Sequence, residues 1–177
     1  MSEDGRVELA GAALEAAGSA HRALLAAGLT CATAESLTGG LIGAHLTAVP
    51  GASATYRGGF VTYATETKAA LLGVPEDLLA AEGAVHPDVA AHMARAARRL
   101  AGADLGLAVT GVAGPEPQDG RAVGTVHAAV AGTGPAPRVE RFRFTGDRSG
   151  IRYRTVEGAL AILVAAVHDG MADHTRG

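Results

Sequence analysis

The stretch Ala34-Glu35-Ser36-Leu37-Thr38-Gly39-Gly40 decides the fold, because it marks a corner between a strand and a helix. Residues 29–33, before it, are rich in small and β-branched side chains and predict a buried strand. Residues 41–49, after it, carry apolar side chains at a period of about 3.6 residues and predict a short helix. A helix start has free backbone N–H groups, and glycine lets a ligand approach them closely. The corner is therefore suited to hold a nucleophilic serine, Ser36, beside an oxyanion site.

The corner also has a purely structural interpretation. A serine or threonine at a helix start commonly caps the helix, and paired glycines then make a tight turn. Taken alone, the stretch favours this capping role for Ser36 or Thr38. Together with the rest of the chain, it predicts that Thr38 caps the helix and leaves Ser36 free for chemistry.

Length and composition indicate one globular domain. The chain has 177 residues, enough for a single core, which we place at about 7–167 with a loose tail at 169–177. Apolar residues make up 48% and charged residues 19%, a balance typical of folded proteins. No run of about 18 apolar residues predicts a membrane span, and Glu3 and Asp4 stand where a signal peptide would be basic. We therefore expect a cytoplasmic protein without a membrane partner.

Charge and ligand spacing limit the partners that the chain can have. The formal net charge is −3 and the arginines are spread along the chain, which argues against a nucleic-acid partner. The seven histidines show no metal-ligand spacing, and the single cysteine, Cys31, has no partner for a disulfide. We therefore expect neither a metal nor an organic cofactor. Alanine-rich helices and a predicted edge strand leave surface for self-association, so we expect a homo-oligomer.

Lysine usage singles out one residue. Fourteen of the fifteen basic residues are arginine, and the only lysine is Lys68. A lysine can lose its proton when it is desolvated, whereas an arginine stays charged in a protein. Lys68 is therefore a candidate for a role that needs a neutral amine. The alternative is that one lysine survived by chance in an arginine-rich composition.

The order of the predicted elements indicates an α/β fold. Helices alternate with the first three strands, and the last two strands form a hairpin. This order predicts a three-layer α/β/α sandwich with a mixed, mostly parallel sheet of about five strands. The last strand alternates charged side chains with Phe142 and Phe144, as edge strands do. Beyond the corner, we expect strands at 58–63, 104–110, 123–131 and 139–145, and helices at 6–27, 65–72, 75–82, 88–100 and from 146–150 to about 167.

Three features gather at one edge of this predicted sheet. Ligands bind such sheets outside the carboxyl ends of the parallel strands. The strands there end in Ser36, in Tyr63 followed by Lys68, and in Thr110 followed by Gly111. Their convergence favours the catalytic interpretation of the serine over the capping one.

Two arginines near the start of the last helix suit an anion. Arg148 and Arg152 are four residues apart and share a face if both are helical. With the free N–H groups of the helix start, such a pair suits a phosphate or a carboxylate. A solvated pair, or a bridge to Asp147 or Glu157, is the alternative.

Several segments of the chain, taken together, match one known family. They are Thr33-Ala34-Glu35-Ser36-Leu37-Thr38-Gly39-Gly40, Gly59-Phe60-Val61-Thr62-Tyr63 with Lys68, Gly73-Val74, Gly83-Ala84-Val85, Thr110-Gly111-Val112-Ala113-Gly114-Pro115, Val123-Gly124-Thr125-Val126 and Gly146-Asp147-Arg148 with Arg152. In these segments the chain resembles the carboxy-terminal domain of the CinA family, in order, from residue 7 to about 167. Stand-alone members of that family are nicotinamide-nucleotide amidohydrolases, which convert nicotinamide mononucleotide to nicotinate mononucleotide and ammonia. The resemblance therefore implies this activity, with a small nucleotide as partner and no cofactor.

The resemblance also implies a serine–lysine mechanism. Ser36 would attack the amide carbon and form an acyl-enzyme. Lys68 would take the serine proton, directly or through Tyr63. The N–H groups of Thr38-Gly39-Gly40 would hold the oxyanion.

The same resemblance implies how the nucleotide is held. Thr110 and Gly111 would line the nucleotide pocket. The 5′-phosphate would be bound by Arg148 or Arg152, and the resemblance does not choose between them.

The chain departs from the family pattern at four places. The family often has cysteine where Leu37 stands, asparagine at Thr65, serine at His86, and Gly-Gly with Lys-Pro in the loop at 116–122. None of these changes removes a residue assigned to chemistry. Thr65 and the loop nevertheless leave two alternatives open. The chain could be a catalytically silent nucleotide-binding or regulatory module, or an amidase that acts on another small amide.

Overall fold

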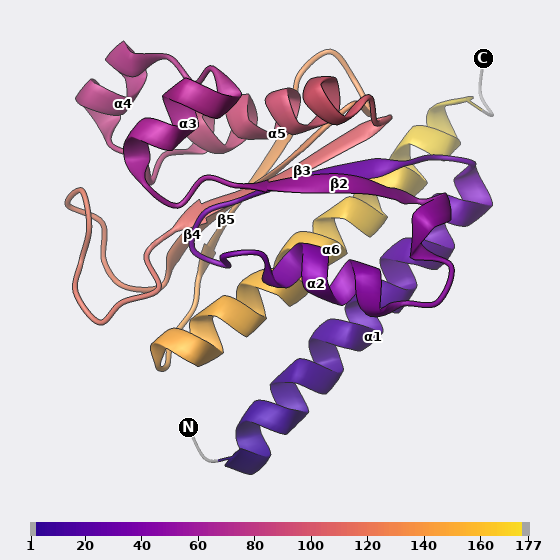
Figure 1. Cartoon of the computed structure of the whole chain (residues 1–177), viewed down its shortest axis with the longest axis horizontal. Coiled ribbons are helices and arrows are strands. Elements are labelled where there is room, and N and C mark those ends of the chain that lie inside the picture. Colours follow the sequence, from indigo (N-terminus) through magenta and orange to yellow (C-terminus); the bar gives the residue numbers. More distant parts are fainter. Residues whose placement is uncertain (1–2, 175–177) are drawn as a thin grey trace.

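The protein is a three-layer α/β/α sandwich around one mixed five-stranded sheet (Figure 1), which confirms the predicted fold class. It is described here from a computed structural model that covers residues 3–174, with side chains from 10 to 171. The strand order is β2-β1-β3-β4-β5, and β1 pairs in parallel with both of its neighbours. β4 runs antiparallel to β3 and to β5, so β5 is an edge strand, as predicted. The strands are β1 (Cys31–Glu35), β2 (Tyr56–Val61), β3 (Leu105–Gly111), β4 (Thr125–Ala131) and β5 (Arg138–Arg143).

Helices cover both faces of the sheet. α1, α2 and α6 lie on one side of it and α3, α4 and α5 on the other (Figure 1). Each side has its own core, and much of both cores is alanine, which lets helices and sheet approach closely. The helices are α1 (Glu3–Ala27), α2 (Leu41–Ala48), α3 (Thr65–Leu72), α4 (Glu76–Glu82), α5 (Pro87–Ala101) and α6 (Arg148–His174), with a 3₁₀ turn at Ala52–Ala54.

Two element boundaries differ from the sequence-based expectation. The strand expected at 29–33 is β1, which lies two residues later, so Glu35 belongs to the strand and not to the corner. The last helix runs to His174 and not to about 167, so the tail expected to be loose at 169–177 is helical as far as it is described. α6 packs along α1, and Asp169 accepts a hydrogen bond of 2.9 Å from Arg138, which holds the extra turns in place. Residues 175–177 lie outside the described part of the chain.

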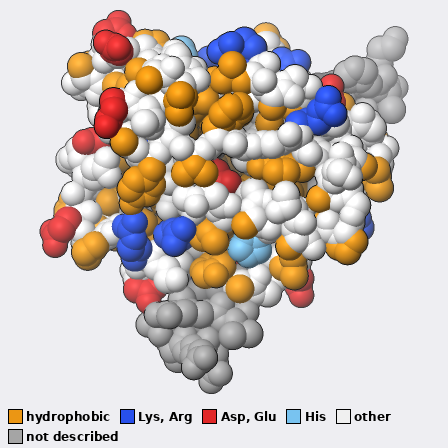
Figure 2. Space-filling model, viewed as in Figure 1, with side chains coloured by type: hydrophobic (Ala, Val, Ile, Leu, Met, Phe, Trp, Pro, Cys, Tyr) orange, Lys and Arg blue, Asp and Glu red, His pale blue; other side chains and the backbone are white. Residues whose placement is uncertain are grey.

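Charged side chains are dispersed over the surface. Figure 2 shows one face of the molecule, on which basic side chains lie in separate small groups among acidic, apolar and uncharged ones. No helix within residues 3–174 is both long enough and apolar enough to cross a membrane.

The topology brings the site together. β1, β2 and β3 are parallel neighbours, so their carboxyl ends, at Glu35, Val61 and Gly111, meet at one edge of the sheet. Each strand is followed there by residues of the predicted site. The first turn of α6 also reaches this edge, because Arg148 donates a hydrogen bond of 2.6 Å to the carbonyl oxygen of Gly114 in the loop after β3.

The close approach between α5 and β3 allows a prediction about the stability of the protein. A Cβ atom on Gly106 would overlap the carbonyl oxygen of Ala94. Gly106→Ala should therefore lower the free energy of unfolding by about 3 kcal/mol, because overpacking forces helix and sheet apart. Urea denaturation measures this change. Gly134→Ala is the matched control, since its Cβ would meet nothing within 4 Å, and an equal loss there would contradict the packing argument.

Candidate active site

A buried carboxylate organises the corner between β1 and α2. Glu35 is only 1% exposed, and its carboxylate accepts hydrogen bonds from the backbone N–H groups of Gly40 at 3.0 Å, Ile42 at 3.1 Å and Gly43 at 2.8 Å. These donors belong to the first turn of α2, so Glu35 is the residue that caps this helix. The prediction that Thr38 caps it is wrong, because its buried hydroxyl makes no hydrogen bond.

The cap provided by Glu35 leaves the neighbouring serine free. The backbone N–H of Ser36 donates to the carbonyl oxygen of Val109 at 3.1 Å, which ties the corner to β3. No hydrogen bond among the described residues engages the Ser36 hydroxyl, and the residue lines a pocket. Ser36 is thus positioned by its backbone while its Oγ atom remains available to a ligand.

The free N–H groups of the corner are not the expected ones. The N–H of Gly39 donates to the carbonyl oxygen of Ser36 at 3.0 Å, and that of Gly40 is held by Glu35. Neither glycine can therefore hold an oxyanion in this arrangement. Within the described chain, the N–H groups of Leu37 and Thr38 donate to no acceptor, which makes them the available donors beside the serine.

Lys68 is buried next to the end of β2. It is 1% exposed, and its Nζ atom donates to the carbonyl oxygens of Thr62 at 2.8 Å and Tyr63 at 3.3 Å. Burial lowers the pKa of Lys68 from 10.5 to about 8, against the opposing effect of the Asp119 and Glu66 carboxylates. The amine is therefore far easier to deprotonate than an exposed lysine. No described hydrogen bond joins it to Ser36.

Arg148 connects two walls of the site. Its guanidinium donates to the hydroxyl of Tyr63 at 2.7 Å and to the carbonyl oxygen of Gly114 at 2.6 Å. The Tyr63 side chain is 59% exposed and its hydroxyl is directed to this arginine, whereas Lys68 contacts the backbone carbonyl of the same tyrosine. This arrangement suits Tyr63 and Arg148 to contact a ligand together.

Arg152 has a different task from Arg148. Its Nε atom donates to the carbonyl oxygen of Leu37 at 3.0 Å, and its Nη2 atom donates to that of Thr38 at 2.7 Å. It therefore braces the corner from α6. The structure thus separates two arginines that the sequence could not distinguish.

These residues surround two adjoining hollows. One, of about 240 Å³, is lined by residues at the corner, at the start of α3 and in the loop after β3. The other, of about 280 Å³, lies over the first turn of α6, where Asp147 accepts a hydrogen bond of 2.8 Å from the N–H of Gly150. Arg148 lines both hollows. The first is lined by Ser36, Leu37, Tyr63, Ala64, Thr65, Gly111, Val112, Ala113, Gly114, Glu116, Gln118 and Arg148, and the second by Asp147, Arg148, Ser149 and Arg152.

Some predicted site residues lie outside these walls. Thr110 does not line the pocket, because its hydroxyl donates to the carbonyl oxygen of Ala84 at 2.7 Å and ties β3 to the segment before α5. Gly111 does line it, as expected. Thr38, Gly39 and Gly40 are not among the residues that line it. No group of three or more histidine, cysteine, aspartate or glutamate side chains within the described chain is arranged to hold a metal ion.

Two site features were missed by sequence reasoning. The cap by Glu35 could have been suspected from an acidic residue placed just before a glycine-containing helix start. The wall formed by Glu116 and Gln118 has no such signal, because it depends on where the loop after β3 folds back.

The capping role of Glu35 predicts how a substitution there changes the stability of the protein. Glu35→Gln should lower the free energy of unfolding by about 2 kcal/mol, because an amide supplies one weaker acceptor for three buried N–H groups. Thermal and urea denaturation measure the loss. Glu15→Gln, on an exposed position of α1, is the control and should change stability by less than about 0.5 kcal/mol. Equal effects of the two substitutions would show that Glu35 is not the cap that holds the corner.

Comparisons with known proteins agree with this architecture. A family model described as the CinA C-terminal domain matches residues 14–167. The chain is 56% identical over 135 residues to a CinA-like protein of Frankia casuarinae, covering 76% of this chain and 31% of that protein. It is 47% identical over 153 residues to a putative competence-damage inducible protein of Symbiobacterium thermophilum, covering 80% and 35%. The chain thus spans about a third of the length of the curated relatives it matches.

Two solved structures are similar to this chain over most of its length. The crystal structure of a competence-damaged protein (CinA) superfamily protein from Klebsiella pneumoniae superposes with a TM-score of 0.85 and 37% sequence identity. The match covers 89% of this chain and 98% of that one. A CinA superfamily protein from Escherichia coli superposes with a TM-score of 0.80 and 34% identity, covering 85% of this chain and 88% of that one.

Proposed function

The chain belongs to the CinA C-terminal domain family, and from this membership and the geometry of the site we propose that it hydrolyses the carboxamide of nicotinamide mononucleotide. The products are nicotinate mononucleotide and ammonia. The observation that carries the proposal is that Ser36, a pocket-lining serine whose hydroxyl has no hydrogen bond within the described chain, lies at the same edge of the sheet as the buried, low-pKa amine of Lys68.

The nucleophile and the base follow from these two side chains. The Ser36 Oγ atom attacks the amide carbon as its proton passes to the neutral amine of Lys68. Both hydrogens of that amine are directed to the carbonyls of Thr62 and Tyr63, which leaves its lone pair free to accept the proton. Base assistance of this kind contributes roughly 10²–10⁴-fold in rate. Because no hydrogen bond joins the two side chains in the free protein, their approach accompanies substrate binding.

Collapse of the tetrahedral intermediate completes the first half of the reaction. The C–N bond breaks, Lys68 returns the proton to the departing nitrogen, and ammonia leaves an acyl-enzyme on Ser36. Water then attacks the ester with the same lysine as base, releasing the nicotinate product and the serine hydroxyl. The N–H groups of Leu37 and Thr38 hold the oxyanion in both steps, and each such donor is worth about 3 kcal/mol.

The two adjoining hollows suit the two ends of a mononucleotide. The pyridine ring occupies the hollow beside Ser36, and the phosphate occupies the hollow over the first turn of α6. We assign phosphate binding to Arg148 because it borders both hollows, whereas Arg152 borders only the hollow over α6 and braces the corner. The hydroxyl of Tyr63, held by Arg148, contacts the substrate and does not relay the proton.

Measuring ammonia release distinguishes the proposed hydrolysis from the alternative functions. Ser36→Ala and Lys68→Arg should each lower turnover of nicotinamide mononucleotide by about 10³-fold or more, because the first removes the nucleophile and the second keeps the charge but cannot act as a base. Ser19→Ala, on a half-buried position of α1 far along the chain from the site residues, is the control and should keep full activity. Normal ammonia release by Lys68→Arg would exclude the serine–lysine mechanism. Binding of the nucleotide without ammonia release by the unaltered chain would identify a regulatory module instead.

The lowered pKa of Lys68 predicts the pH dependence. Only the neutral amine can accept the serine proton, so kcat/KM should rise tenfold per pH unit below about 8 and level off above it. Rates of ammonia release measured between about pH 6 and 10 check this profile. A rate that is constant through this range would mean that the ionisation of Lys68 does not control the reaction.

Phosphate recognition can be tested with a substrate pair. Arg148→Gln should lower kcat/KM for nicotinamide mononucleotide by about 10²-fold, because a charge-assisted contact with the phosphate is lost. The same substitution should change kcat/KM for nicotinamide riboside, which lacks the phosphate, by less than about threefold. Arg57→Gln, on an exposed position of β2, controls for the loss of one positive charge. Equal losses for both substrates would assign Arg148 to another role.

A further inference from the structure

A second cavity lies on the α5 side of the sheet, outside the proposed active site. It has a volume of about 310 Å³ and lies between the start of α5 and strands β4 and β5. Four of its six lining residues are basic or imidazole side chains, and none is acidic: His86, Arg121, His127 and Arg141 lie with Pro87 and Val139. We propose that this cavity is a second anion site that binds a phosphoryl group, as free phosphate or as a small phosphate monoester.

Two residues that line this cavity each carry a buried polar atom without a hydrogen bond. His127 is only 6% exposed, and its Nδ1 atom has no partner. The Nε atom of Arg121 is also buried without a partner. A buried polar group left unsatisfied costs about 1–3 kcal/mol, so a polar ligand that lets these two side chains rearrange would recover part of that cost.

The donors converge from separate elements. His127 on β4 is the cross-strand partner of Arg141 on β5, so both side chains lie on the same face of the sheet. His86 approaches from the start of α5, and Arg121 from the loop after β3. A tetrahedral phosphoryl group accepts hydrogen bonds from several directions, which matches this arrangement better than a planar carboxylate held by one guanidinium.

His127 contributes an uncharged hydrogen-bond donor to the cavity. Burial, together with the nearby Arg141, His86 and Arg121, lowers the pKa of His127 to about 4. His127 is therefore neutral at pH 7 and can donate one N–H to an anion. The Nδ1 atom of His86 accepts the N–H of Asp88 at 3.3 Å and caps α5, so the Nε2 atom is the one that can donate to an anion.

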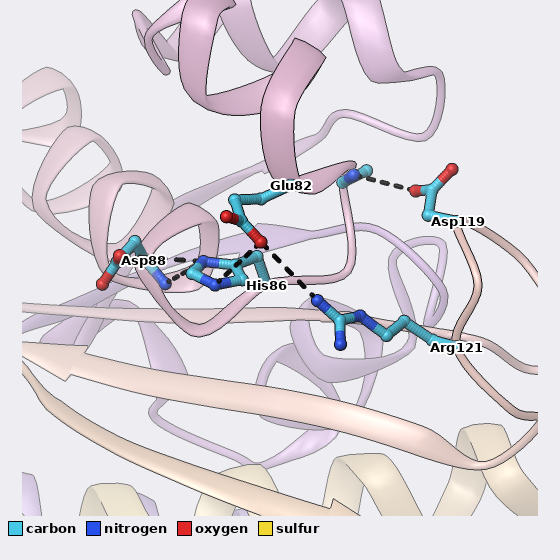
Figure 3. Close-up of polar contacts among 6 residues, drawn as sticks. Glu82, His86, Asp88, Asp119 and Arg121 are labelled. Atoms are coloured by element: carbon cyan, nitrogen blue, oxygen red, sulfur yellow. Dashed lines mark hydrogen bonds and ion pairs between the residues drawn. The ribbon is translucent and has the colours of Figure 1, made fainter.

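Two acidic side chains, Glu82 and Asp88, lie beside His86 (Figure 3). The carboxylate of Glu82 lies 3.8 Å from Arg121 Nη2 and 3.6 Å from His86 Nε2, and that of Asp88 lies 3.7 Å from His86 Nδ1. These separations exceed hydrogen-bond length, and both carboxylates are substantially exposed. Glu82 therefore acts as a weak competitor that an incoming anion displaces from Arg121.

One loop borders both the cavity and the proposed active site. Glu116 and Gln118 line the active-site pocket, whereas Arg121, on the same loop, lines the anion cavity. Asp119, between them, accepts a hydrogen bond of 2.9 Å from the N–H of Ala84 and pins the loop to the segment before α5 (Figure 3). The proposed anion site has its own lining residues and does not rest on the proposed amidase activity.

Titration with inorganic phosphate, followed by NMR of the His127 imidazole and by calorimetry, tests the site. Phosphate should perturb the His127 signals saturably. Arg121→Gln and Arg141→Gln should each weaken binding about tenfold or more, because each removes a charged donor. Glu82→Gln should tighten binding about threefold by removing the competing carboxylate. Arg143→Gln, on the same strand but outside the cavity, is the control and should change binding less than twofold.

Further measurements distinguish free phosphate from a phosphate monoester, and the anion cavity from the active site. Glycerol phosphate binding more tightly than inorganic phosphate would assign the site to a monoester, and the reverse order to free phosphate. Arg148→Gln should leave the His127 response unchanged, because Arg148 borders only the active-site hollows. Absence of a saturable His127 response, or equal weakening by Arg143→Gln and Arg141→Gln, would overturn the proposal. These readouts do not involve ammonia release, so their failure would leave the proposed reaction untouched.

Discussion

The hydrogen bonds from the start of α2 to the Glu35 carboxylate hold the corner on which the site depends. A buried carboxylate is costly unless it is fully satisfied, and three backbone donors supply that compensation here. Because Glu35 takes over the capping role, the next residue, Ser36, is free to face the pocket. Arg152 supports the same turn from the other side by donating to two of its carbonyls. Ser36 is thus held by two elements that are distant in sequence, α2 and α6.

The burial of Lys68 lowers the pKa of its amine and makes this edge of the sheet suitable for base chemistry. Lys68 is the only lysine in the chain and is one of its most completely buried large side chains. Its amine is satisfied by two backbone carbonyls and not by a carboxylate, so desolvation outweighs the stabilising charges and lowers its pKa. A carboxylate in direct contact would have kept it protonated. The absence of such a contact within the described chain is what suits Lys68 to act as a base.

The loop between β3 and β4 borders both the active-site pocket and the anion cavity. One part of it lines the active-site pocket and another lines the anion cavity, while Asp119 anchors it to the segment before α5. The two sites therefore border the same short, exposed segment.

The sequence by itself determined the order of helices and strands and the edge position of β5, and it proposed Ser36 and Lys68 as candidate catalytic residues, because periodicity, turn chemistry and composition are local properties. It also indicated that three strand ends would meet, since parallel topology requires this. Only the tertiary structure decided that Glu35 and not Thr38 caps α2, that Thr110 faces Ala84 and that Arg148 and Arg152 have different partners. It likewise decided which corner N–H groups remain free. These outcomes depend on distances between groups far apart in the chain, which no local pattern encodes.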